Sequence, residues 1–147
     1  MTPDDDEILA RFPGLTFPPA IYLEDGSDRF NCVAWAAGTR SQWWDPMSLR
    51  DYWPPGCPRA TTVIAFELAL ESAGYRVCEV PDLQSGIEVI ALMGLEGDFS
   101  HVMKQLPNGM WTSKLGAGPL VEHHLYDLVG DAYGQLHSFM NRPSRPD

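Results

Sequence analysis

The pattern of apolar and polar positions divides the chain into a first part with helical spacing and a second part with strand alternation. A run of small apolar residues follows Asn31 and stops at Gly38. Asn is a favoured N-cap and Gly is favoured just past a helix end, so this run predicts a short, buried helix that starts at about Cys32. A second helix is predicted over Thr61–Ala73, where apolar side chains recur at helical spacing and glutamates lie on the other side.

Strands are predicted after this second helix, where the apolar runs become short and are separated by turn residues. They cover Tyr75–Cys78, Ile87–Met93, Ser100–Leu106, Met110–Lys114 and Tyr133–Met140. Residues 107–109 (Pro-Asn-Gly) predict a hairpin between two of these strands, because an Asn-Gly turn is a strong hairpin signal. A short helix is expected at about Glu122–Val129. Helices followed by mainly antiparallel strands predict the α+β class, with N-terminal helices packed on the sheet.

The length and composition predict a single domain. The chain has 147 residues, about the size of one ordinary domain, and no internal repeat or linker divides it. We expect the domain to span residues 28–142. An extended, proline-containing segment over residues 1–27 precedes it, and a flexible tail over residues 143–147 follows it, with fraying expected from Asn141 onward.

The balance of charges limits the classes of molecule that the protein is expected to bind. Ten basic and twenty acidic residues give a formal net charge of −10. This charge argues against nucleic acids and anionic membranes, because both are bound through Lys and Arg. A peptide or protein substrate, or a basic partner protein, is compatible with it. The acidic N-terminus is unlike a signal peptide, so we expect a cytoplasmic protein, or an effector exported by a specialised system.

Cys32 is the strongest candidate for chemistry. The chain has three cysteines, which cannot all pair with one another, and free thiols are the default in a reducing compartment. A thiol at the start of a helix lies near partial positive charge, which favours the thiolate nucleophile, and near free backbone amides, which can hold an oxyanion. Cys57 and Cys78 are expected to be structural.

A cysteine nucleophile also needs a base, and His101 is the best candidate because it opens a predicted strand at a loop edge. A polar side chain on the next strand would then orient the imidazole ring. Depending on the strand register, this residue is either Ser113 or Lys114, and the sequence leaves both open. Adjacent histidines at 123 and 124 make a poor chelate and no other metal-ligand spacing is present, so we expect neither a metal nor a cofactor.

Together these residues resemble the papain-like superfamily of Cys-His hydrolases, including its NlpC/P60 and CHAP branches. The likeness lies in a cysteine at the start of a buried helix and a histidine at the start of a strand hairpin. A closer likeness, to a family of small bacterial domains, covers about residues 28–142. It rests on Asn31-Cys32-x-Ala34-Trp35-Ala36, Glu88-x-Ile90-Ala91, His101-x-x-x-Gln105-Leu106, Gly109-x-Trp111-x-Ser113-Lys114-Leu115-Gly116 and Glu122-His123.

The resemblance implies a papain-like fold and a site built on Cys32 and His101. Papain-like proteases carry a Gln shortly before the nucleophile, and residues 25–30 contain none. Asn31 and the Cys32 amide are therefore expected to hold the oxyanion. Besides Ser113 and Lys114, two further side chains are alternatives for orienting the imidazole, namely Gln105 and His123.

Two functions from different classes are compatible with the sequence. The first is a cysteine hydrolase that cleaves, transfers or deamidates an amide bond in a peptide, isopeptide or peptidoglycan stem. The second is a catalytically inactive papain-like domain, or an acidic interaction protein that binds a basic partner. Residues 41–59 hold three of the five tryptophans and form either an ordered loop over the core or one wall of a cleft. The expected cleft residues are Trp35, Trp43, Trp44, Gln105, Trp111 and His123.

Overall fold

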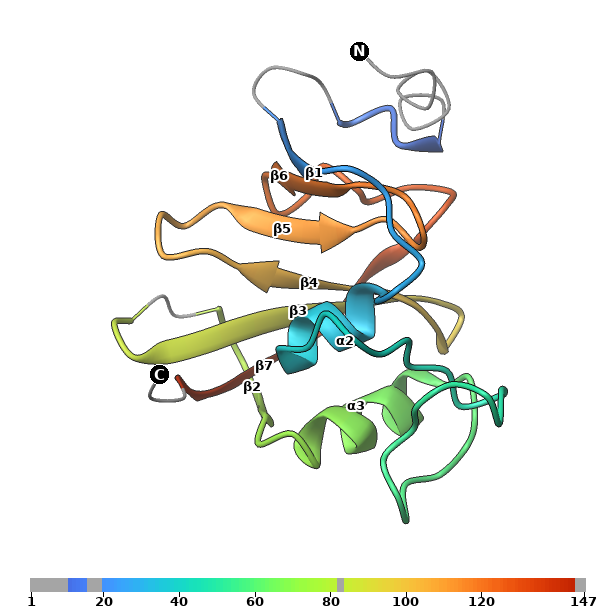
Figure 1. Cartoon of the computed structure of the whole chain (residues 1–147). Helices are drawn as coiled ribbons and strands as arrows, with labels where there is room; N and C mark the ends of the chain where they lie inside the picture. Colours follow the sequence, from blue (N-terminus) through green and yellow to red (C-terminus); the bar gives the residue numbers. More distant parts are fainter. Residues whose placement is uncertain (1–10, 16–19, 82–83, 145–147) are drawn as a thin grey trace.

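One open antiparallel sheet of seven strands organises the molecule (Figure 1). The computed structural model describes residues 11–15, 20–81 and 84–144. The strand order across the sheet is β1-β6-β5-β4-β3-β7-β2. In chain order the elements are β1 (Ile21–Glu24), α2 (Cys32–Ala37), α3 (Val63–Glu71), β2 (Arg76–Cys78), β3 (Ile87–Leu95), β4 (Asp98–Gln105), β5 (Trp111–Lys114), β6 (Leu120–His123) and β7 (Gln135–Pro143).

Helix α2 begins and ends where its capping residues predict, so this prediction is confirmed. The Asn31 side chain accepts a hydrogen bond from the Ala34 amide at 3.1 Å. At the other end Gly38 adopts the left-handed conformation, with φ of 97°, and its amide donates to the Ala34 carbonyl at 3.0 Å. A residue with a Cβ is strained in that conformation, which explains why the helix stops at a glycine.

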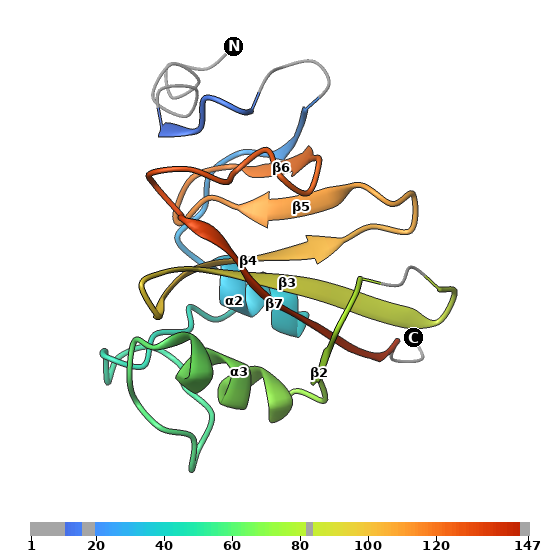
Figure 2. The ribbon, with the colours of Figure 1, turned by 180° about the vertical axis from the view of Figure 1, so that it is seen from behind.

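Both helices lie on the same face of the sheet (Figures 1 and 2). Helix α3 starts after Thr62, whose hydroxyl accepts from the Ala65 amide at 3.2 Å, and it is shorter than the predicted 61–73. The buried side chains between the helices and the sheet form what we call the helix-side cluster. Its members include Phe30, Cys32, Val33, Trp44, Trp53, Phe66, Leu70, Leu92, Val102 and Met140.

The opposite face of the sheet is covered by the segment between β6 and β7 and by N-terminal residues. Phe12 and Leu15, from the segment expected to be only extended, are 2% and 0% exposed there. Together with β1, which pairs with β6, they make this segment part of the domain core. We call the buried set on this side the back-face cluster; it includes Phe12, Leu15, Met93, Met103, Trp111, Val121, Leu128 and Tyr133.

Strand β7, the last in the chain, lies between β3 and β2. Met140 is paired with Ile90 of β3 and with Val77 of β2. The strand continues to Pro143, and Arg142 is 4% exposed. The expectation of fraying from Asn141 is therefore wrong for residues 141–143, because β3 pairs with all three and β2 also pairs with Asn141. Residues 145–147 lie outside the described part of the chain.

Two predictions about secondary structure are wrong. The expected helix over Glu122–Val129 is replaced by the end of β6 followed by turns. The predicted α+β class with N-terminal helices packed on the sheet is also wrong, because strands make up 36% and two short helices 12% of the structure, which is a β-rich fold. The physical reason is that α2 ends at Gly38 and α3 begins only after the Thr62 cap, so both helices are short, while strands β3 to β7 all join the sheet. Within the described ranges, no helix is long and apolar enough to cross a membrane.

Candidate functional site

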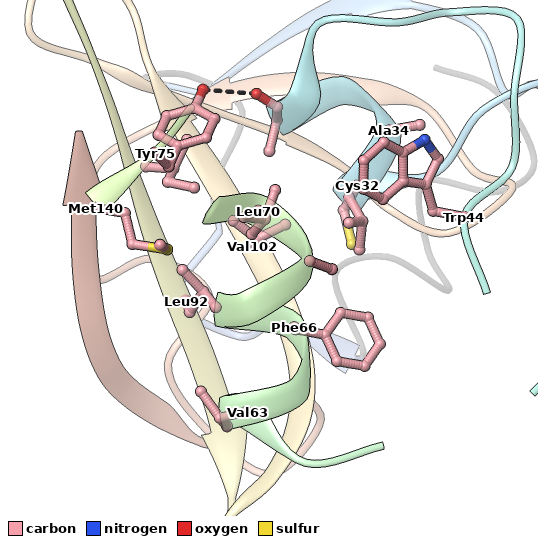
Figure 3. Packing of buried hydrophobic residues seen from close by; sticks show 14 of the residues in the cluster. Cys32, Ala34, Trp44, Val63, Phe66, Leu70, Tyr75, Leu92, Val102 and Met140 are labelled. Carbon is pink, nitrogen blue, oxygen red and sulfur yellow. Dashed lines mark hydrogen bonds between the residues drawn. The ribbon is translucent and has the colours of Figure 1, made fainter. Parts of the chain in front are cut away.

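Cys32 is the first residue of α2, as predicted, and it is 8% exposed. Its neighbour Asn31 fixes this end of the helix, because its side-chain amide also donates to the Trp44 carbonyl at 2.7 Å. The loop over residues 41–59 is thereby fastened over the thiol. Figure 3 shows the Cys32 side chain between Trp44 and Phe66, inside the helix-side cluster.

This environment opposes ionisation of the thiol. Burial raises the pKa of Cys32 to about 11, although backbone groups of Val102 and Val33 and the charge of Lys114 act to lower it. At pH 7 the neutral thiol form of Cys32 therefore predominates. The partial charge at the start of α2 is therefore outweighed by the loss of water around the sulfur atom.

His101 lies on β4 and is 1% exposed. Its ring stacks on Tyr133 of the back-face cluster, with 4.2 Å between centroids and 9° between planes. Burial, with a smaller contribution from His123, holds the pKa of His101 well below its usual value. Its Nε2 atom has no hydrogen-bond partner among the described residues, and none of the hydrogen bonds found there joins it to Cys32. His101 thus packs against a residue of the back-face cluster, whereas Cys32 belongs to the helix-side cluster, and their catalytic pairing stays a prediction.

The strand register decides which side chains share a face with His101. Gln105 is paired with Trp111, so by alternation along both strands the face of His101 is shared by Ser113, while Lys114 faces the helices. Ser113 bonds to His123 rather than to His101, with 2.7 Å between Oγ and Nε2. His123 Nδ1 lies 2.7 Å from the His124 carbonyl oxygen, which can only accept, so Nε2 accepts the proton of the Ser113 hydroxyl.

Lys114 is fully buried, which is rare for a lysine. Its Nζ donates to the carbonyls of Ser27 and Gly116 at 2.6 and 2.7 Å and lies 4.9 Å from the centroid of the Phe30 ring. Burial lowers the pKa of Lys114, while negative charge at Cys32, Asp28 and Glu24 would raise it. Through these hydrogen bonds Lys114 holds the segment before α2 and the turn after β5 in place.

The structure contains a cleft at some distance along α2 from the thiol, at the helix's C-terminal end. It has a volume of about 870 Å³ and lies between α2 and the adjoining parts of β3, β4 and β7. Of the six expected cleft residues, Trp35 and Gln105 line it. The other four do not: Trp44, Trp111 and His123 are buried in the core, and neither Trp43 nor any other residue of the loop over 41–59 lines this cleft. That loop instead covers the helix-side cluster, as the first of the two alternatives predicted.

Three charged residues of the cleft, Glu88, Lys104 and Arg142, were not predicted as site residues, although Glu88 belongs to a motif that carries the closer likeness. Glu88 accepts from Arg142 Nε at 2.9 Å and pairs with Lys104 Nζ at 2.8 Å. Burial acts to raise the pKa of Glu88, but hydrogen bonds from Arg142 and Lys104 lower it below its usual value. Arg142 also donates to the carbonyls of Ala73 and Ala37 at 2.7 and 3.2 Å, so it links the ends of both helices to the sheet. In the sequence, Arg142 follows Met140 at the alternating spacing of a strand, and this spacing could have predicted that the strand continues to Arg142.

Comparisons with known proteins identify a family but no activity. No curated protein and no solved structure matches the chain. In the described ranges no group of three or more His, Cys, Asp or Glu side chains is placed to hold a metal ion. The papain-like resemblance is untested by these comparisons and stays a prediction. A family model described as a domain of unknown function, DUF7689, matches residues 21–141, and the chain therefore belongs to that family.

Proposed function

We propose that this protein is a ligand-binding domain whose ligand occupies the cleft between α2, β3, β4 and β7. The observation that carries the proposal is the cleft itself: about 870 Å³ is within the range of small-molecule sites. Its walls combine apolar side chains with polar ones, of which Glu88, Lys104 and Arg142 are fixed by ion pairs, and ligand sites contain both kinds of group. The proposal differs from both functions that the sequence left open, and it shares with the second only the absence of catalysis.

The surroundings of Cys32 support the same choice. A cysteine hydrolase needs a thiolate beside an imidazole, whereas this thiol has a pKa of about 11 and the ring of His101 stacks on Tyr133. Cys32 packs against Trp44 and Phe66 as a small apolar side chain does. A basic protein partner, which the net charge of −10 favours, stays a prediction.

The alkylation rate of each cysteine against pH, followed by peptide mass spectrometry, tests this interpretation. We expect Cys32 to react more slowly than the half-buried Cys57 and Cys78 at every pH at which the protein is folded. The variant His101→Phe keeps a ring for stacking on Tyr133 and removes the imidazole, and we expect it to leave the Cys32 rate unchanged. Fast alkylation of Cys32 near pH 6 that disappears in His101→Phe would contradict the proposal.

A cysteine hydrolase is the second candidate function, and two observations favour it. Cys32 is the first residue of α2, and the nearby charge of Lys114 acts to lower the pKa of its thiol. In this mechanism Cys32 would attack an amide carbonyl, and His101 would first take the thiol proton and later give it to the leaving amine. The same alkylation experiment decides between the two candidates, because the hydrolase requires the fast, His101-dependent reaction.

A further inference from the structure

The acidic group of the cleft, the Glu88 carboxylate, already has a partner on each of its oxygens. Both carboxylate oxygens of Glu88 accept hydrogen bonds, Oε2 from Arg142 and Oε1 from Lys104. A second nitrogen of Arg142 lies 3.4 Å from Oε1. A cationic ligand would therefore have to break one of these pairs before it reached the carboxylate, and the exposed fraction of the Glu88 side chain is 19%.

The two basic groups of the cleft differ in what they can still offer. The Arg142 side chain is 4% exposed and donates to Glu88, Ala73 and Ala37. Lys104 is 18% exposed and its ammonium group donates to Glu88 alone among the described residues. An ammonium group carries three N–H bonds, so two of those on Lys104 have no acceptor among the residues that the structure describes.

Among its described lining residues the cleft therefore carries one more positive than negative charge, although the whole chain has a net charge of −10. Lys104 is one of only two lysines in the chain, and the other is buried in the core. Its Nζ lies 5.7 Å from the centroid of the Trp35 ring, which holds the ammonium group beside an apolar wall. Further apolar wall comes from Ala37, Ile87, Val89, Leu106 and Pro107.

We propose that the ligand of this cleft is an amphipathic carboxylate, with its anionic group on the Lys104 ammonium and its apolar body against Trp35 and the apolar wall. This inference rests on the proposed function, because it names the chemical class of the ligand that the cleft would take. A carboxylate accepts the two N–H bonds that Lys104 has left, and charge-assisted hydrogen bonds of this kind are the strong ones. Lys104 keeps its pair with Glu88, so the site needs no rearrangement.

Three probes with one apolar body test the inference, namely phenylbutyrate, phenylbutanol and phenylbutylamine. Each is titrated into the isotope-labelled full chain, and binding is followed through the backbone amide signals of the cleft. We expect phenylbutyrate to bind at least tenfold more tightly than the other two probes. We expect the tighter binding of phenylbutyrate to be lost in Lys104→Met and mostly restored in Lys104→Arg, which keeps the positive charge. In the matched control Arg50→Met we expect it to be unchanged, because Arg50 is exposed and distant in sequence from every cleft residue.

The possible failures separate the two proposals. If the alcohol or the amine binds in the cleft as tightly as the acid, the carboxylate inference is overturned while the proposed function stands. If Lys104→Met weakens all three probes equally, Lys104 acts through the shape of the cleft, and the inference is again overturned. If no probe binds at millimolar concentration to a chain whose amide spectrum shows it folded, both proposals fail.

Discussion

Among single side chains near the surface of the sheet, Arg142 is the one whose replacement we expect to lower the free energy of unfolding most. Its guanidinium donates to the Ala37 carbonyl at the end of α2, to the Ala73 carbonyl just after α3, and to Glu88 on β3. It also stacks over the Tyr75 ring at 4.3 Å. One side chain from the last strand thus holds the ends of both helices.

The expected cost of Arg142→Met follows from these contacts. Removing one partner of a buried ion pair costs about 3–5 kcal/mol, and hydrogen bonds from a charged donor contribute about 1.5–3 kcal/mol each. Glu88 keeps Lys104 as a partner, which limits the loss. We therefore expect the free energy of unfolding to fall by about 3–5 kcal/mol and the melting temperature to fall by roughly 10 °C.

Urea denaturation followed by tryptophan fluorescence measures this loss, and Arg76→Met is the matched control. Arg76 also donates to two carbonyls, that of Glu71 at the end of α3 and that of Tyr75 just before β2, but it is exposed and forms no ion pair within the described ranges. Its replacement is expected to change the free energy of unfolding by about 0.5 kcal/mol or less. A loss below 1 kcal/mol for Arg142→Met, or a loss equal to that of the control, would refute the reasoning.

Three further predictions concern the core. Burial lowers the pKa values of His101 and His123, so below about pH 6.5 the unfolded chain binds protons that the folded chain does not. The free energy of unfolding therefore falls with falling pH, by up to about 1.4 kcal/mol per pH unit for each histidine. Urea denaturation at pH 7.5 and 5.5 measures this fall, which is smaller in His101→Phe; equal stability at both pH values would contradict it. Ser113→Ala leaves the buried Nε2 of His123 without a donor and should cost about 1–3 kcal/mol by the same assay, whereas a loss under 0.5 kcal/mol would show that the bond contributes nothing. Gly134→Ala places a Cβ against a backbone carbonyl of β3 at φ of 78° and should lower the melting temperature far more than Gly56→Ala, which has φ of 81° and open space; equal effects would exclude the contact as the cause.

Local signals in the sequence predicted most of the elements. The caps at Asn31 and Gly38 located α2 because both act within one helical turn. The Pro-Asn-Gly turn over 107–109 located the β4–β5 hairpin for the same reason, since the turn and its flanking strands are neighbours in sequence. Both features are decided by contacts that are short in sequence.

The elements predicted wrongly depend on distant partners. The segment over 122–129 has apolar residues at helical spacing, but its first residues pair with β1 and β5, and that pairing outweighs a weak local preference. The residues over 141–143 look like a polar end until β2 and β3 are known to lie on either side. The fold class was wrong because such pairings convert ambiguous segments into strands.

The candidate site likewise combines features set by residues close in sequence with features set by distant ones. The position of Cys32 at the start of α2 could be read from sequence, whereas the burial that raises its pKa comes from Trp44 and Phe66, which reach it from a loop and from another helix. The role of Ser113 as a partner of His123 required the register of β5 on β6. Trp35 and Gln105 were expected at a cleft, but the ion pairs beside them join β3, β4 and β7.

The place of β7 in the sheet has a consequence for synthesis of the chain. Strand β2 pairs with β7, and β3 has β7 as one of its two neighbours, although both precede it by many residues. While the protein is being made, β2 therefore has no strand to join, and one edge of β3 stays open until the final strand leaves the ribosome. The sheet is therefore completed only once β7 has been synthesised rather than progressively from the first strand onward, and a nascent chain that stalls before residue 135 would present unpaired strand edges to chaperones.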